Sequence, residues 1–187
     1  MSEVFPAPCP DDLRSIGLFG ALPDEVLAYL CASLERLKVD TGDLIFREGD
    51  SGRELFVVLE GRLEVLKRSS AGAETPVASL GPQDWFGEMS VLDVQPRSAT
   101  VRALSPARLL RVRAADLDAL YRRDLKAYTL VVLNVARELS RRLRAADGLL
   151  ANFMADVMAF YIARGGEPLA SDRPPPPSDK PPPSAVL

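Results

Sequence analysis

The sequence predicts a mainly β fold with flanking helices, followed by a long C-terminal helix. Between about Leu37 and Val112, short runs rich in Val, Leu, Ile and Phe alternate with turn residues, a pattern typical of sandwiches and barrels. No stretch with helical periodicity separates these runs, which argues against a parallel α/β sheet. From about Leu125 to Arg164, in contrast, apolar residues recur at steps of three and four, as they do along one face of a helix.

Two segments precede the β region. Residues 1–10 are expected to form an N-terminal arm, and they lack the basic and apolar regions of a secretory signal. Pro23, at a first helical position, is expected to open a helix over Asp24–Leu34. One face of this helix is apolar and carries Val26, Leu27, Leu30 and Leu34.

Turn residues divide the β region into strands. They cluster at Thr41–Asp43, Gly49–Gly52, Glu60–Gly61, Ser69–Gly72 and Gly81–Pro82. Polar and apolar residues alternate over Leu63–Lys67 and over Leu109–Val112, which predicts half-buried strands with one face in the core. A short helix over Ala114–Leu120 is expected to lead to the long one.

The long helix carries an apolar seam sustained over four heptads, which is typical of a coiled coil. The seam consists of Val132, Val135, Leu139, Leu143, Ala146, Leu150, Phe153, Val157 and Phe160. A helix of about 40 residues is about 60 Å long, which exceeds the diameter of a small domain. We therefore expect a parallel homodimer with contacts through Val132, Leu139, Leu143, Leu150 and Phe153. The alternative is that the seam packs on the β domain of its own chain.

Proline marks the end of the expected folded region. Eight of the 16 prolines lie at or after Pro168, so residues 165–187 are predicted to be disordered or to adopt polyproline II. This tail is either solvated or docked in an aromatic groove of a partner. The expected organisation is an arm (1–10), a β domain (11–123), a long helix (124–164) and this Pro-rich tail (165–187).

The composition excludes several classes of site. The 187 residues include no histidine and two cysteines, Cys9 and Cys31. Triads with histidine, histidine metal sites and a Cys₄ zinc site are therefore excluded, and we predict no catalytic residue, no metal and no enzyme activity. A net charge of −3 disfavours non-specific binding of nucleic acid. The most apolar stretch, Tyr128–Ala136, is shorter than the roughly 20 residues of a membrane span, so a cytoplasmic protein without membrane contact is expected.

The most informative segment contains Phe-Gly-Glu-Met-Ser at 86–90 and Arg-Ser-Ala-Thr at 97–100. Gly87 permits close approach of the backbone to a ligand, and a short helix over Glu88–Leu92 would direct free N–H groups toward an anion. The guanidinium of Arg97 and the hydroxyl of Ser98 would bind the same anion. Because Glu88 cannot bind an anion, its carboxylate needs a hydroxyl donor, as a ribose provides. This combination predicts a nucleotide site.

Glu88 and Arg97 also allow a structural interpretation, in which the two side chains form a buried salt bridge with no ligand. A glycine, a small hydroxyl and an alanine gathered around one arginine favour ligand binding, because a structural pair has no need of them.

The segment resembles the phosphate-binding cassette of the cyclic nucleotide-binding domain, found in catabolite activator proteins, kinase regulatory subunits and gated channels. The resemblance extends from about Leu18 into the long helix, some 130 residues. It implies a double-stranded β-helix, a jelly-roll-like β-roll, followed by a C-terminal dimerisation helix. It also implies β-roll turns at Gly42, Gly49, Gly61, Gly81 and Gly87.

By this resemblance the ligand is cAMP or cGMP, with no other cofactor. Glu88 would bind the ribose 2′-hydroxyl and Arg97 the cyclic phosphate. The implied ligand-binding residues are Phe86, Gly87, Glu88, Met89, Ser90, Arg97, Ser98, Ala99, Ala146 and Asp147. Relatives cap the purine with hydroxyl residues where this chain has Ala146 and Asp147, a departure that bears on the choice of base. Ser98 is compatible with both nucleotides, and cAMP is favoured.

We therefore expect a cyclic-nucleotide sensor that signals through its long helix to a second copy or to a protein effector. Only about 23 residues follow Arg164, too few for the roughly 70-residue helix-turn-helix domain of transcription-factor relatives, so no DNA binding is expected. Two alternatives remain open. One is a ligand-free interaction module of the same fold, and the other is a transcription-regulator relative that lacks its DNA-binding domain.

Overall fold

The computed structural model describes residues 8–70 and 72–163, and the chain divides into two units, Met1–Leu139 and Ser140–Leu187. The helical elements are α1 (Pro10–Arg14), η1 (Gly17–Phe19), α2 (Asp24–Ser33), α3 (Met89–Leu92), α4 (Ala114–Arg123) and α5 (Leu125–Ala163). The strands are β1 (Glu35–Val39), β2 (Leu44–Phe46), β3 (Glu54–Glu60), β4 (Leu63–Arg68), β5 (Glu74–Leu80), β6 (Trp85–Phe86), β7 (Thr100–Ala103) and β8 (Ala107–Arg113).

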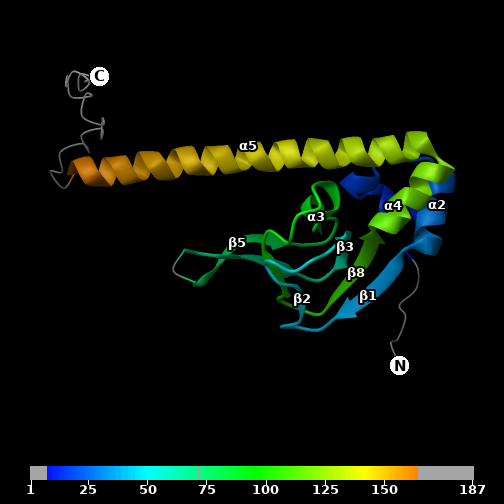
Figure 1. Cartoon of the computed structure of the whole chain (residues 1–187), viewed down its shortest axis with the longest axis horizontal. Helices are drawn as coiled ribbons and strands as arrows, with labels where there is room; N and C mark the ends of the chain where they lie inside the picture. Colours follow the sequence, from blue (N-terminus) through cyan, green and yellow to red (C-terminus); the bar gives the residue numbers. More distant parts are fainter. Residues whose placement is uncertain (1–7, 71, 164–187) are drawn as a thin grey trace, which may run out of the picture. The chain divides into compact units, whose positions relative to one another are not determined.

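Two four-stranded antiparallel sheets form the body of the first unit (Figure 1). The strand order is β1-β8-β3-β6 in one sheet and β2-β7-β4-β5 in the other. Strands far apart in the sequence are paired, since β1 lies against β8 and β2 against β7. This arrangement is the predicted β-roll followed by a long C-terminal helix, and that prediction is confirmed.

Apolar side chains fill two cores, one on each face of the β1-β8-β3-β6 sheet. The core between the sheets contains Phe56, Val58, Leu63, Leu80, Phe86, Val101, Ala107 and Leu109. The other core joins the sheet to the helices and includes Leu13, Leu18, Leu27, Leu30, Leu55, Val57, Leu110, Val112, Leu120 and Val131. Neighbouring residues of a strand point to opposite faces, so β3 and β8 supply both cores in alternation.

The prediction that Leu109–Val112 forms a half-buried strand is therefore wrong. Leu109 faces the core between the sheets, whereas Leu110 and Val112 face the helices. Only Arg111 in this stretch is partly exposed, because the second sheet covers the Leu109 side of β8 and helices cover the Leu110 side. The pairing of β4 with β5 shifts where Val65 lies opposite Ala78 and Leu66 opposite Pro76, so Val77 of β5 is the extra residue of a bulge.

The helices before the β region differ in detail from those expected. Pro23 is the residue before α2 rather than its first residue, with extended backbone angles (φ −62°, ψ 151°). The sequence analysis did not predict α1 or η1, and Pro10 of the expected arm is the first residue of α1. Residues 1–7 of that arm lie outside the described residues.

The seam of α5 divides into two parts. Val135 is 4% exposed and Leu139 packs partly against the core of its own chain, as in the alternative interpretation. Beyond Ser140, the seam residues Leu143, Leu150, Phe153, Val157 and Phe160 are all exposed. The division between the two units also falls at 139/140, inside α5. Arg164 and the Pro-rich tail lie outside the described residues.

In the part of the chain that the structure describes, α5 alone has the length and composition of a membrane-spanning helix. Its most apolar 18-residue window has a mean hydropathy of 1.2, and none of that window is buried. The expectation that Tyr128–Ala136 is the most apolar stretch is wrong, because Leu149–Ala163 is longer and its strongly polar residues are only Asn152 and Asp156.

Candidate functional site

The predicted cassette, residues 86–99, connects β6 to β7 and contains α3. Glu88 immediately precedes α3, and its carbonyl oxygen accepts hydrogen bonds from the N–H groups of Val91 and Leu92, both at 3.0 Å. The predicted turn of helix after Gly87 is thus confirmed. Glu88 itself is buried, with 4% of its surface exposed.

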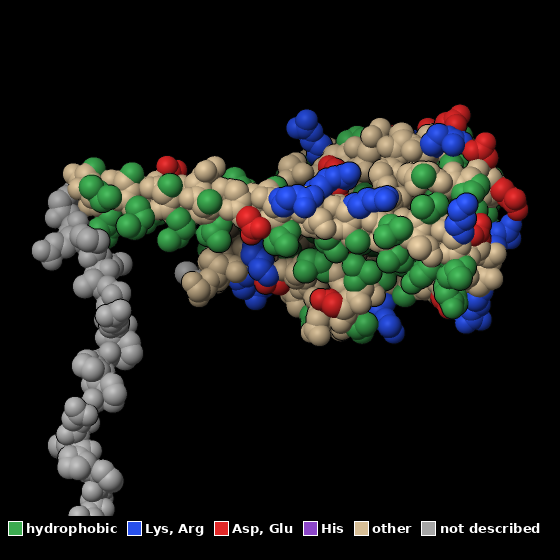
Figure 2. Space-filling view, turned by 90° about the horizontal axis from the view of Figure 1, so that it is seen from above, with side chains coloured by type: hydrophobic (Ala, Val, Ile, Leu, Met, Phe, Trp, Pro, Cys, Tyr) green, Lys and Arg blue, Asp and Glu red, His purple; other side chains and the backbone are tan. Residues whose placement is uncertain are grey.

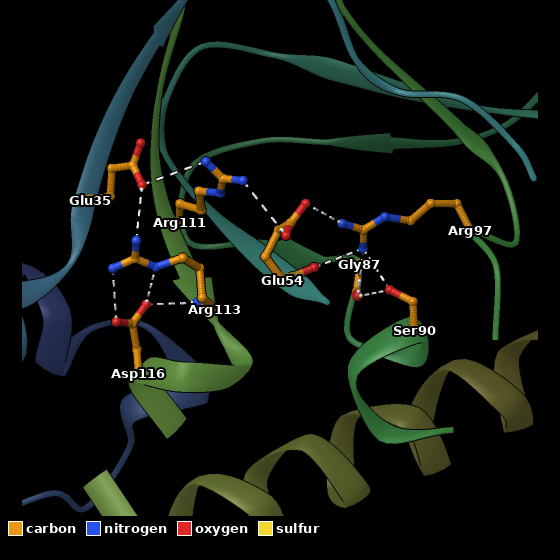
Figure 3. Close-up of polar contacts among 8 residues, drawn as sticks. All are labelled: Glu35, Glu54, Gly87, Ser90, Arg97, Arg111, Arg113 and Asp116. Carbon is orange, nitrogen blue, oxygen red and sulfur yellow. Dashed lines mark hydrogen bonds and ion pairs between the residues drawn. The ribbon is translucent and has the colours of Figure 1, made fainter. Parts of the chain in front are cut away.

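Arg97 is the centre of the cassette, and it is 97% buried (3% exposed). Its Nη1 donates to the carbonyl oxygens of Glu54 at 2.7 Å and Gly87 at 3.0 Å, and to Ser90 Oγ at 2.7 Å (Figure 3). Its Nη2 donates to Glu54 Oε1 at 3.0 Å. The guanidinium carbon also lies 4.1 Å from the centre of the Phe46 ring, a cation–π distance.

Two glycines make room for this guanidinium. A Cβ on Gly52 would lie 2.5 Å from Arg97 Nε and Nη2, and a Cβ on Gly87 would lie 2.8 Å from Nη1. Gly87 also has φ +83°, a left-handed conformation that side chains disfavour. Gly87 was expected to permit close approach of a ligand, and in the structure its close neighbour is Arg97.

Burial lowers the pKa of the Arg97 guanidinium, and the carboxylate of Glu54 opposes this shift. Among the described residues, Arg97 Nε and Arg111 Nε are buried without a hydrogen-bond partner, and of the two only Arg97 belongs to the cassette. A buried donor without an acceptor is unfavourable, so an acceptor supplied from outside the chain would stabilise it. An anion provides such an acceptor.

The carboxylate of Glu54 begins a row of alternating charges that leads away from the cassette (Figure 3). Glu54 Oε2 lies 3.7 Å from Arg111 Nη2, and Arg111 Nη1 lies 3.5 Å from Glu35 Oε2. Glu35 Oε2 also lies 3.8 Å from Arg113 Nη1, and Arg113 Nε pairs with Asp116 Oδ2 at 3.1 Å. Because Asp116 Oδ2 also accepts a hydrogen bond from the backbone N–H of Arg113 at 2.8 Å, the row ends at the first turn of α4.

Backbone and side-chain contacts hold the cassette against the β2–β3 and β4 segments. The N–H of Arg97 donates to the carbonyl of Asp50 at 2.8 Å, and the N–H of Gly49 donates to the carbonyl of Arg97 at 2.9 Å. Lys67 Nζ donates to Glu48 Oε1 at 2.8 Å and also to the carbonyl of Ser98. The hydrogen bond from Lys67 lowers the pKa of Glu48.

The other predicted cassette residues have different environments. The Phe86 ring belongs to the core, where it stacks on Phe56 with 5.4 Å between centroids. Ser90 is buried and binds Arg97, while Ser98 and Met89 are exposed and Ala99 is half-buried. The structure therefore brings Gly87, Ser90 and Arg97 into direct contact.

Comparisons with known proteins agree with this geometry. A family model described as the cyclic nucleotide-binding domain matches residues 36–124. The chain is 38% identical to the N-terminal domain of a transcriptional regulator from Streptomyces coelicolor A3(2), covering 71% of this chain and 94% of that one, with a TM-score of 0.64. The chain belongs to the cyclic nucleotide-binding domain family.

Two further relatives are named for cAMP or contain it. The cyclic AMP receptor protein of Thermus thermophilus is 37% identical over 81% of this chain and 66% of its own length. The regulatory domain of Toxoplasma gondii PKA, in complex with cAMP, is 32% identical over 59% of this chain and 42% of that one, with a TM-score of 0.55. The chain thus spans slightly less than two thirds of the length of the receptor protein that it matches.

Sequence reasoning missed two residues of this cyclic nucleotide-binding domain, Gly52 and Glu54. Both contact Arg97 from 43 or more positions away along the chain, and no local pattern relates them to it. Gly52 was recognised only as a turn residue. Ala146 and Asp147 belong to the second unit, so their contact with the base stays a prediction.

A cavity of about 330 Å³ lies beside α3 of the domain. It is lined by Val91 of α3, by Tyr128 at the start of α5 and by four residues of α4, which are Ala114, Leu117, Asp118 and Tyr121. The helix that follows Glu88 therefore has free space on the side that faces α4.

Proposed function

We propose that the chain is a regulatory sensor that binds a cyclic nucleotide, cAMP in preference to cGMP, and passes binding on through α5. The observation that carries the proposal is the environment of Arg97, a buried cation whose Nε has no acceptor among the described residues. The cyclic phosphate would accept from Arg97 and from N–H groups beside Gly87. The carboxylate of Glu88 would accept a hydrogen bond from the ribose 2′-hydroxyl.

The proposed preference for cAMP rests on two relatives at 37% and 32% identity, a cyclic AMP receptor protein and a regulatory domain in complex with cAMP. Ser98, the residue next to Arg97, is exposed and is compatible with either base, so it does not decide between them. Ala146 and Asp147 remain our candidates for the base contact, because they stand where the family caps the purine.

The signal would leave the site through α3. The cavity beside Val91 gives α3 space to move toward α4 when the ligand orders the cassette. Ligand binding shifts such an equilibrium only if the two positions of α3 differ in affinity. The row of ion pairs from Glu54 to Asp116 offers a second connection, from the partner of Arg97 to the start of α4.

A parallel homodimer through Leu143, Leu150 and Phe153 would complete the sensor. In heptad terms Leu143 and Leu150 occupy a positions, which puts Arg142 at g and Asp147 at the following e. These opposite charges face each other across an in-register parallel pair. As part of this proposal, the sensor is a cytoplasmic protein. An effector protein would bind the dimer and respond to its change on nucleotide binding.

Calorimetric titration with cAMP and with cGMP tests the proposal. Arg97→Lys keeps the charge but loses the fork of donors, so affinity should fall by about 10- to 100-fold. The matched control is Arg102→Gln, because Arg102 pairs with Glu64 on the second sheet. If neither nucleotide binds the wild-type chain, the ligand-free interaction module is the correct function.

A further inference from the structure

A second line of apolar side chains runs along the end of α5, beside the dimer seam. It consists of Met154, Met158 and Ile162, spaced by four residues and 52%, 48% and 67% exposed, and we call it the outer stripe. One residue of an α-helix corresponds to a turn of about 100°, so Met158 points about 100° away from Val157 of the seam. Figure 2 shows hydrophobic side chains gathered over this end of α5.

A two-stranded coiled coil would leave the outer stripe in water. With Val157 at an a position, Met154 is at e, Met158 at b and Ile162 at f. Positions b and f of a two-stranded coiled coil face the solvent. Each dimer would then expose two such stripes, and contiguous apolar patches of this kind usually mark an interaction site.

A lipid bilayer is a poor fit for this segment. Its length alone does not exclude a bilayer, because the most apolar 18-residue window of α5 would span about 27 Å as a helix. However, the charged Asp156 lies in the middle of Leu149–Ala163, where burial in hydrocarbon is costly, and this segment contains no Lys or Arg that would bind anionic headgroups.

A second dimer fits the stripe better. The stripe is uncharged, so two copies can meet without repulsion, and the flexible methionines adapt to each other's shape. If seam and stripe are both buried, each helix keeps one solvent-facing side, which carries Asn152 and Asp156. One polar side and a broad apolar side are the pattern of a helix in a four-helix bundle.

We propose that two dimers associate through the outer stripe, so that Leu149–Ala163 of four chains form a four-helix bundle. This inference rests on the dimer of the proposed function and not on the nucleotide. The assembly is therefore a tetramer of four chains. The seam joins the two chains of each dimer, and the outer stripe joins the two dimers.

Sedimentation velocity of the full chain tests the tetramer. The wild type should sediment with the mass of four chains, and Met154→Gln/Met158→Gln/Ile162→Gln should sediment as a dimer. The dissociation constant of the tetramer should rise by about 100-fold or more, because three apolar contacts per chain are lost. Asn152→Gln, in the same segment but on the polar side, is the matched control and should remain tetrameric.

Three results would overturn the inference. The first is a wild type that sediments as a dimer at every concentration, and the second is a triple variant that sediments as a tetramer. The third is flotation with phosphatidylglycerol vesicles that recovers the wild type but not the triple variant, which would assign the stripe to a membrane surface. Nucleotide titration of the triple variant separates the two proposals, since its affinity should equal that of the wild type whatever its mass.

Discussion

Arg97 and Glu54 form an ion pair inside the cyclic nucleotide-binding domain, with 3.0 Å between Nη2 and Oε1. Glu54 binds the same guanidinium a second time, through its carbonyl oxygen. The side chain proposed to hold the cyclic phosphate is therefore oriented by a carboxylate of its own chain. That carboxylate both positions Arg97 and opposes the approach of an anion.

Replacing Glu54 separates these two effects. Glu54→Gln keeps an amide oxygen as acceptor for Nη2 but removes the negative charge, so affinity for cAMP should rise by about 3- to 10-fold. Glu54→Ala also removes the acceptor, and its affinity should be lower than that of the Gln variant. Isothermal titration of both variants measures the difference, and a loss of affinity in Glu54→Gln would contradict the competing role of the charge.

Gly52 should not tolerate a side chain. In Gly52→Ala the new Cβ would lie 2.5 Å from Arg97 Nε and Nη2, so the guanidinium must move. Nucleotide affinity should fall by about tenfold or more, and the free energy of unfolding by about 1–3 kcal/mol. Gly81→Ala is the control, because nothing lies within 4 Å of that Cβ. Equal behaviour of the two variants would show that the packing of Arg97 against Gly52 is unimportant.

The hydroxyl of Ser90 should matter for stability as well as for binding. Ser90→Ala removes the acceptor that lies 2.7 Å from Arg97 Nη1 inside the protein. The free energy of unfolding should decrease by about 1.5–3 kcal/mol, the usual range for a hydrogen bond to a charged group. Urea denaturation without nucleotide measures it. Ser98→Ala, at an exposed position, should leave stability within about 0.5 kcal/mol of the wild type.

The two parts of the α5 seam should respond differently to a charge. Leu139 packs against the core of its own chain, so Leu139→Asp should destabilise the fold, by about 2–4 kcal/mol. Leu150 is 60% exposed within its own chain, so Leu150→Asp should keep the fold but lose association through the seam, which lowers the mass of the assembly. Thermal unfolding and light scattering give the two readouts. A Leu150→Asp variant with the same mass as the wild type would contradict the proposed seam.

Acid should weaken the anchoring of the cassette by Glu48. The pKa of Glu48 is lowered by the hydrogen bond from Lys67, so this carboxylate stabilises the fold above its unfolded pKa of about 4.3. That contribution is lost as the pH falls through the lower, folded pKa. Glu48→Gln should therefore be less stable than the wild type at pH 7, and this difference should disappear near pH 3. A difference that grows on acidification would have the wrong sign.

Much of the β-roll was predictable because its signals are local. Turn residues at Gly42, Gly49 and Gly61 have the positive φ angles that glycine permits, and the segment after Gly87 forms the expected short helix. The periodicity of α5 also predicted its start at Leu125. The burial of β8 on both faces was not predictable in this way, because it depends on which elements pack against each face.

The same distinction between local signals and contacts distant in sequence applies to the candidate site. The sequence by itself determined the residue types of the cassette, the glycine that its turn requires and the periodic seam of α5, since each follows from neighbours along the chain. Only the tertiary structure decided that Gly52 and Glu54 surround Arg97, that Phe86 belongs to the core and that the seam changes from buried to exposed after Leu139. These are contacts between segments distant in sequence, and packing of the two sheets and the helices creates them.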